Sequence, residues 1–258
     1  MPMPPETQQL IEQALESVRN DPQHNLNLYQ RFAIYYSFGR SRLHLSGYTK
    51  SGEESNLAEG DKISEEEFTN PNLADFALSW LAILTTKKVE LIWNGIWEQI
   101  DIEENKWFIG KNSFENGLQD CNRLLLGNLT YREGVNSLYE NVYWTLNQVD
   151  NRTTYDIAQA YRTLYVTVEF ILDGLPGIYR GGIIVENLVA EDVHVNDFTV
   201  PAVEAYSSID ESPRGDSNCF PPPKPIKYDL SKRLEFWEWW LTEAIPQAWE
   251  LAETQSKE

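Results

Sequence analysis

The chain has 258 residues, and its 40 acidic residues outnumber its 21 basic residues, which gives a formal net charge of −19. Such a charge argues against binding to the phosphate backbone of a nucleic acid or to an anionic membrane, because both targets need a cationic surface. It fits either a role in solubility or an acidic face that complements a basic protein partner.

The first half of the chain is predicted to be helical, because apolar residues recur there at three- and four-residue steps. Thr7 is the expected N-cap of the first helix. Trp93 and Trp97 stand one turn apart in a further apolar run, and we assign both rings to the core. The polar stretch at residues 46–62 predicts a loop. The expected helices of this half lie at residues 7–20, 28–38 and 73–84.

The second half continues the helical pattern, with one ambiguous stretch. Residues 183–189 are mostly apolar and can form either a pair of strands or an irregular helix, so a small β element is left open. Residues 209–228 are rich in proline and are expected to form a linker to the last helix. Further helices are expected at residues 118–126, 130–149, 153–172 and 199–206.

The last helix, residues 229–253, is expected to lie at the centre of the fold. Apolar residues cover most of its circumference, and such a helix cannot lie on a surface as an ordinary amphipathic helix does. Asp229 or Ser231 can cap its start, and Pro246 should kink or restart it, because proline lacks the N–H that an α-helix needs. The residues expected to stabilise the fold are Trp237, Trp240, Leu241 and Trp249.

These patterns together predict one all-α domain over residues 1–258, an irregular multi-helix bundle around a central C-terminal helix. The N-terminus has no basic region followed by an apolar one, and no segment approaches the roughly 20 apolar residues of a membrane span. We therefore expect a cytoplasmic protein without membrane association. Cys121 and Cys219 form no CxxC pair, so reduced thiols are expected.

Candidate chemistry is sparse in this sequence. Its three histidines form no Ser-His-Asp or Cys-His arrangement whose spacing supports catalysis, so we predict no catalytic or cofactor-binding residue. One cluster of carboxylates with an imidazole could hold a divalent metal ion, although a solvated acidic loop is the plainer interpretation. The members of this cluster are Glu186, Glu191, Asp192, His194 and Asp197.

A specific functional hypothesis comes from the C-terminal stretch Lys232 to Trp249, which reads KRLEFWEWWLTEAIPQAW. This stretch resembles the C-terminal signature of a mostly helical family, the fifth in the numbering of immunity proteins of bacterial polymorphic toxin systems. The resemblance implies a protein that binds and neutralises a toxin without catalysis and without a cofactor. The implied partner is a basic toxin domain.

An acidic face would speed association with such a toxin domain and orient it, while a few buried aromatic residues hold the complex. Two alternatives stay open: an enzyme with a metal centre around Glu186 to Asp197 that acts on a small molecule, and an acidic adaptor or scaffold protein. The carboxylates that we expect on the partner-binding face are those of Glu53, Glu54, Glu59, Asp61, Glu186, Glu191 and Asp192.

Overall fold

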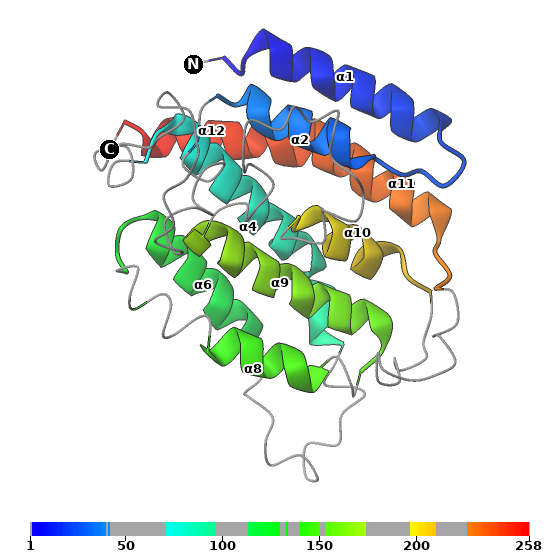
Figure 1. The fold of residues 1–258 in the computed structure, drawn as a ribbon, viewed down its shortest axis with the longest axis vertical. Helices are drawn as coiled ribbons and strands as arrows, with labels where there is room; N and C mark the ends of the chain where they lie inside the picture. Colours follow the sequence, from blue (N-terminus) through cyan, green and yellow to red (C-terminus); the bar gives the residue numbers. More distant parts are fainter. Residues whose placement is uncertain are drawn as a thin grey trace, which may run out of the picture. The chain divides into compact units, whose positions relative to one another are not determined.

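The computed structural model describes residues 2–39, 41, 71–95, 113–129, 133, 140–149, 153–173, 197–209 and 226–257. Within these residues the regular structure is helical, which confirms the predicted all-α class; the ambiguous stretch 183–189 lies outside them. The helices are α1 (Pro5–Asn20), α2 (Leu28–Ser37), α4 (Leu73–Asn94), α6 (Ser113–Leu125), α8 (Glu140–Val149), α9 (Tyr155–Asp173), α10 (Thr199–Ser207), α11 (Leu230–Trp239), the π-helical turn η7 (Trp240–Ala244) and α12 (Ile245–Gln255) (Figure 1).

The chain divides into two compact units. The first is drawn from Met1–Ala82, Glu169–Asp197 and Trp237–Glu258, and the second from Ile83–Val168 and Phe198–Phe236. Neither unit is one continuous stretch, so segments far apart in the sequence must come together to build each of them. That the whole chain forms a single domain stays a prediction.

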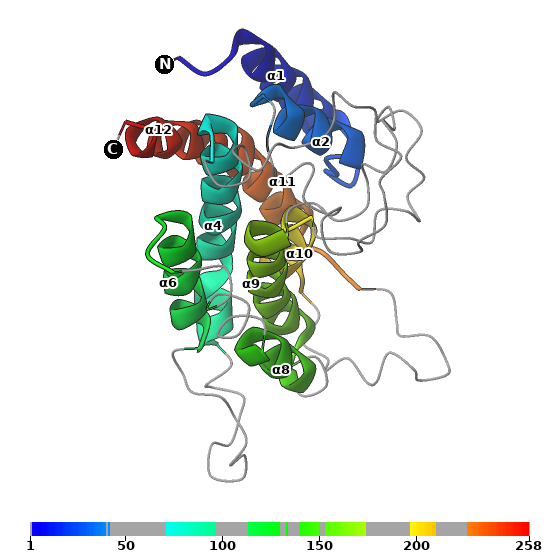
Figure 2. The same ribbon diagram turned by 60° about the vertical axis from the view of Figure 1, so that its left-hand side comes forward.

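In the first unit, α1 and α2 lie side by side (Figure 1 and Figure 2). The Thr7 hydroxyl, near the start of α1, donates to the carbonyl of Ser37 at the end of α2 over 3.2 Å, so the two helices run antiparallel. The prediction that Thr7 caps α1 is therefore wrong. The helix begins two residues earlier, at Pro5, whose fixed φ and missing N–H suit a first helical position without a side-chain cap.

Aromatic rings dominate the core of the first unit. Tyr35 of α2 packs edge-on against Trp240, with ring centroids 6.0 Å apart, and Trp240 packs edge-on against Trp237 at 5.8 Å. Edge-to-face pairs of this kind contribute about 0.5–1.5 kcal/mol each beyond the area that they bury. Trp237, Trp240, Leu241 and Trp249 are all buried, so each of the four predicted stabilising residues lies where a core residue should.

The expected interruption of the last helix is present as a π-helical turn, η7. The Ile245 N–H donates to the carbonyl of Trp240, five residues back instead of four. Pro246 follows directly, and it can neither donate to the carbonyl of Thr242 nor pack against it without a clash. One wider turn relieves this conflict, which is the usual way in which a π-bulge enters an α-helix. The predicted cap is also confirmed, since Asp229 accepts from the N–H groups of Ser231 and Lys232.

The second unit has its own aromatic cluster. Trp93 near the end of α4, Phe114 of α6 and Tyr161 of α9 meet with ring centroids between 4.5 and 6.1 Å apart. The core assignment of Trp93 is thus confirmed, whereas Trp97 lies outside the described residues. Helix α4 continues from Leu73 to Asn94, through Lys87 and Lys88, because lysine is a good helix former.

Helices α6 and α9 approach each other closely at Gly117. A Cβ atom built on Gly117 would lie 2.9 Å from Leu164 Cδ2 and 3.2 Å from Leu164 Cδ1, and Leu164 is fully buried. The absent side chain therefore permits the helix contact. Cys121, one turn further along α6, is a buried free thiol whose pKa is raised by burial and by the neighbouring charge of Asp120.

We expect Gly117→Ala to destabilise the chain. Alanine gains about 1 kcal/mol of helix propensity over glycine, but overpacking a buried contact costs about 1–3 kcal/mol, so the net change should be a loss. Urea unfolding followed by circular dichroism would measure it, with Glu115→Ala on the exposed side of α6 as the matched control. A Gly117→Ala variant more stable than the wild type would contradict the close approach.

Candidate functional site

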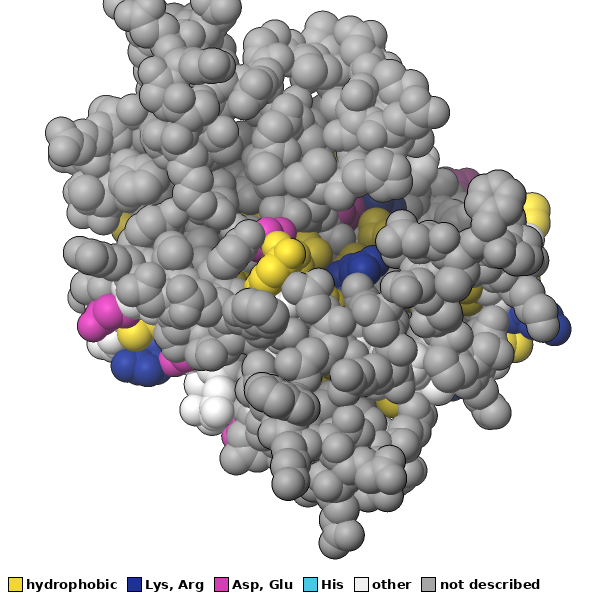
Figure 3. Space-filling view, turned by 60° about the horizontal axis from the view of Figure 1, so that its bottom comes forward, with side chains coloured by type: hydrophobic (Ala, Val, Ile, Leu, Met, Phe, Trp, Pro, Cys, Tyr) yellow, Lys and Arg dark blue, Asp and Glu magenta, His cyan; other side chains and the backbone are white. Residues whose placement is uncertain are grey.

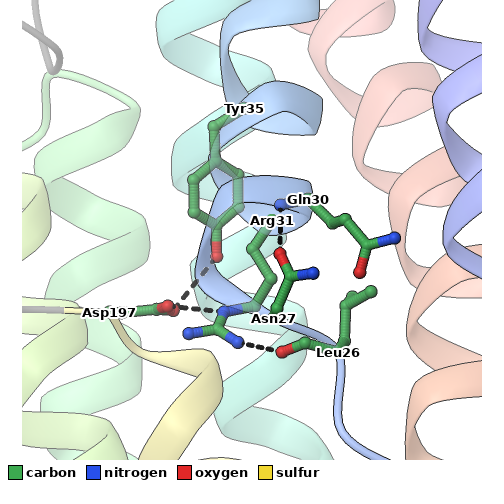
Figure 4. Close-up of polar contacts among 6 residues, drawn as sticks. All are labelled: Leu26, Asn27, Gln30, Arg31, Tyr35 and Asp197. Carbon is green, nitrogen blue, oxygen red and sulfur yellow. Dashed lines mark hydrogen bonds and ion pairs between the residues drawn. The ribbon is translucent and has the colours of Figure 1, made fainter. Parts of the chain in front are cut away.

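The best-defined polar centre of the first unit is a buried ion pair between Arg31 of α2 and Asp197 (Figure 4). Arg31 Nε donates to Asp197 Oδ2 over 2.7 Å, and the Tyr35 hydroxyl donates to Asp197 Oδ1 over 3.2 Å. The two charged side chains are only 9% and 4% exposed. Both carboxylate oxygens of Asp197 are therefore engaged inside the fold.

Arg31 makes further contacts that keep its guanidinium in place. Its Nη1 atom donates to the carbonyl of Leu26, just before α2 begins, and its Cζ atom lies 5.8 Å from the centre of the Trp237 ring. The next residue, Asn27, caps α2 by accepting from the Gln30 N–H over 3.0 Å. A buried charge needs this density of partners, because removing it from water is costly unless its donors are used.

Most of the site residues predicted from the sequence cannot be placed. Asp197 alone of the metal cluster is described, in its ion pair with Arg31; Glu186, Glu191, Asp192 and His194 lie outside the described residues. The same holds for the rest of the expected partner-binding face, Glu53, Glu54, Glu59 and Asp61. Among the described residues, no group of three or more His, Cys, Asp or Glu side chains could hold a metal ion. Both proposals stay predictions.

The opposite side of the start of α2 forms an open groove against α1. The groove holds about 200 Å³, and one of its walls carries Tyr29, whose side chain is 41% exposed. Gln30 also lines it, and its Oε1 atom is buried without a hydrogen-bond partner among the described residues. Figure 4 shows the Gln30 side chain extending away from Arg31. We call this feature the α1–α2 groove; its lining residues are Leu10, Gln13, Asn27, Tyr29, Gln30 and Ala33.

Helix α1 also carries negative charge at exposed positions, and Glu6 stands one turn before the groove-lining Leu10. Glu6, Glu12 and Glu16 are exposed, and none of them forms an ion pair with another described residue. Arg19, at the end of the helix, forms an ion pair with Glu238, with 2.7 Å between Arg19 Nε and Glu238 Oε1. On the face drawn in Figure 3, the described acidic and basic side chains lie interspersed with hydrophobic ones, without a single-sign patch among them. Glu243 and Glu250 of the last helix are also exposed without an ion pair to a described residue, so α1 is one of the acidic surfaces of the described chain.

A second polar cluster lies in the second unit. The Glu204 carboxylate of α10 accepts from the Tyr155 and Tyr228 hydroxyls, and the Arg233 guanidinium lies 4.6 Å from the centre of the Tyr228 ring. Tyr228 pairs with Ser208 in an isolated antiparallel bridge. This cluster therefore holds together the two chain segments that flank residues 210–225.

Close by, the Tyr206 hydroxyl donates to Glu235 over 2.5 Å, and the Lys88 ammonium lies 5.1 Å from the centre of the Tyr206 ring. Burial, the hydrogen bond and the negative charge of Glu235 raise the pKa of Tyr206 to about 12. The neutral hydroxyl is thus favoured in the folded chain.

Sequence reasoning missed both Arg31 and Gln30. A signal was present for Arg31, because a charged residue stands there on the apolar stripe of α2 between Leu28 and Tyr35. No comparable signal marks Gln30, whose unpartnered oxygen appears only once α1 is packed beside it.

No protein-family model matches the chain, and none of the curated proteins matches it. No described helix is both long enough and apolar enough to cross a bilayer.

Two ion pairs of equal length allow a direct test of burial. Asp197→Ala should destabilise the chain by about 3–5 kcal/mol, because it leaves the Arg31 charge buried and unpaired. Glu238→Ala breaks the Arg19 pair, also 2.7 Å long but 57% and 38% exposed, and should cost about 0–1 kcal/mol. Urea unfolding measures both. Equal losses would show that the burial of Asp197 does not decide how much its ion pair contributes to stability. The double variant Arg31→Met with Asp197→Leu, which removes both charges, should recover most of the stability that Asp197→Ala loses.

The raised pKa of Tyr206 predicts a dependence of stability on alkaline pH. Between the ordinary value of 10.0 and about 12, the folded chain holds a proton on Tyr206 that the unfolded chain has released, so stability falls as the pH rises. Below pH 10 the contribution is fully present. In urea unfolding at several pH values, Tyr206→Phe should show a shallower fall than the wild type over this window. Parallel curves for the two proteins would contradict the assignment.

Proposed function

We propose that this chain is an acidic, cytoplasmic protein-binding module that neutralises a basic toxin domain by covering it. The observation that carries the proposal is the unbalanced charge, −19 overall, together with the exposed carboxylates of Glu6, Glu12 and Glu16 on α1, which form no ion pair with a described residue. Carboxylates that serve the fold are paired, as those of Asp197 and Glu204 are. Unpaired ones on a well-formed helix are free to meet a cation.

The partner class, a toxin domain, comes from the resemblance of residues Lys232 to Trp249 to an immunity-protein signature. The burial of Trp237, Trp240 and Trp249 indicates that the part of this stretch from Trp237 onward serves the core of the first unit. In this proposal the C-terminal stretch maintains the fold, and a different surface contacts the toxin. Helix α1 supplies the described part of that surface.

The physical mechanism is electrostatic steering followed by occlusion. An acidic helix attracts a cationic surface over roughly 8–10 Å at ordinary ionic strength, which raises the association rate and selects the orientation of the encounter. Once docked, the bound chain excludes substrate from the toxin surface. This mechanism needs no reacting group on the chain itself.

The first experiment is an affinity pull-down from the native cytoplasm at low salt, eluted with a salt step and analysed by mass spectrometry. We expect one basic, toxin-like protein that leaves the column when salt is added. Recovery of acidic or membrane proteins only, or of none, would overturn the proposal.

With the recovered partner in hand, charge reversal localises the steering. The triple variant Glu6→Lys, Glu12→Lys and Glu16→Lys should lower the association rate at low salt by about tenfold or more and flatten its salt dependence. The matched control is Glu115→Lys, Glu243→Lys and Glu250→Lys, which changes the net charge equally at other exposed positions. Stopped-flow fluorescence measures both rates. Equal effects in the two triple variants would show that overall charge, and not α1, steers the partner.

A further inference from the structure

One residue that lines the α1–α2 groove, Gln30, has a side-chain acceptor without a hydrogen-bond donor among the described residues. Gln30 Oε1 is buried and accepts no hydrogen bond from a described residue, while the backbone N–H of Gln30 already donates to the Asn27 side chain. A buried acceptor without a donor costs free energy, and a rotation of the Gln30 amide toward the groove would let a ligand bring a donor to it. The first requirement on an occupant is therefore an N–H or O–H group.

The size and the walls of the groove narrow the choice further. A volume of about 200 Å³ is smaller than the roughly 300–1,000 Å³ of pockets for drug-sized molecules, and it suits one long side chain. Leu10, Ala33 and the ring of Tyr29 offer apolar surface along which an alkyl stem can lie. The second requirement is an apolar stem that ends in the donor.

The charge beside the groove selects a cation. On α1, Glu6 is one turn before Leu10 and Glu16 is one turn after Gln13, so both carboxylates flank the stretch of α1 that lines the groove. Neither has an ion-pair partner among the described residues. A guanidinium meets all three requirements better than an ammonium does, because it has five donors and stacks on aromatic rings such as that of Tyr29.

We propose that the α1–α2 groove receives one arginine side chain of the basic partner, with its guanidinium on Gln30 Oε1 and near the α1 carboxylates. This inference rests on the proposed function for the source of the arginine. The groove itself can be tested without the partner, because a blocked amino acid presents the same side chain.

The probe is N-acetyl-L-argininamide, titrated at low salt into the full ¹⁵N-labelled chain and followed by NMR. We expect millimolar binding with shift changes centred on Leu10, Gln13 and Gln30. N-acetyl-L-citrullinamide, which has the same shape without the charge, should bind at least tenfold more weakly. Equal binding of the two probes, or shift changes centred elsewhere, would overturn the proposal.

Two matched variants complete the test. Gln30→Met keeps the length of the side chain but removes the acceptor, and it should weaken binding of the arginine probe at least tenfold while the melting temperature stays the same or rises, since an unsatisfied buried atom is removed. Gln247→Met, at an exposed position of α12, should change neither. Unchanged binding in Gln30→Met, with the fold intact, would overturn the assignment of Gln30.

The two proposals fail in different ways. If a toxin-like partner binds the wild type and Gln30→Met equally well, the groove is not part of the interface, and the proposed function still holds. If the groove binds arginine specifically but the pull-down recovers no basic partner, the groove proposal holds and the proposed function fails.

Discussion

The first unit depends on the buried pair between Arg31 and Asp197, two residues 166 positions apart in the sequence. The pair is worth more as a constraint than as a source of energy, because a well-packed apolar replacement is often equally stable, whereas a single unpaired charge is not tolerated. It requires α2 and the segment before α10 to keep one relative position. The Tyr35 hydroxyl shares the same carboxylate, so the aromatic core and the ion pair are fixed together.

This constraint reaches the surface through the start of α2. Arg31 also donates to the carbonyl of Leu26, and the adjacent Asn27 caps the helix, so the first turn of α2 is held from inside and at its end. Gln30 belongs to that same turn and faces the α1–α2 groove. A groove wall held in this way loses little conformational entropy when a ligand enters, which is the condition for useful affinity from a small contact. The buried charge thereby holds one wall of the groove in place without lining the groove itself.

The parts of the fold that sequence analysis predicted are those that local pattern controls. Periodicity located α2 and α10 closely, and the chemistry of proline explains why the last helix is interrupted just before Pro246. The error at Thr7 has a local cause too, since a proline two residues earlier began the helix without a cap. The pairing of Arg31 with Asp197 and the unpartnered oxygen of Gln30 could not be predicted, because each depends on which distant segment becomes the neighbour. Local sequence carries no information on that choice.

The acidity of the chain therefore has two distinct origins. Asp197 and Glu204 are tied to donors within their own units, and their charge is part of the fold. Glu6, Glu12 and Glu16 have no such tie, and Glu12 and Glu16 stand four residues apart on one helix face, where like charges repel by a few tenths of a kcal/mol. Glu6 lies in the first turn, where a negative charge interacts favourably with the helix dipole. The two later carboxylates have no such compensation, and a cationic partner would provide it, so relief of repulsion within α1 adds to the attraction across the interface.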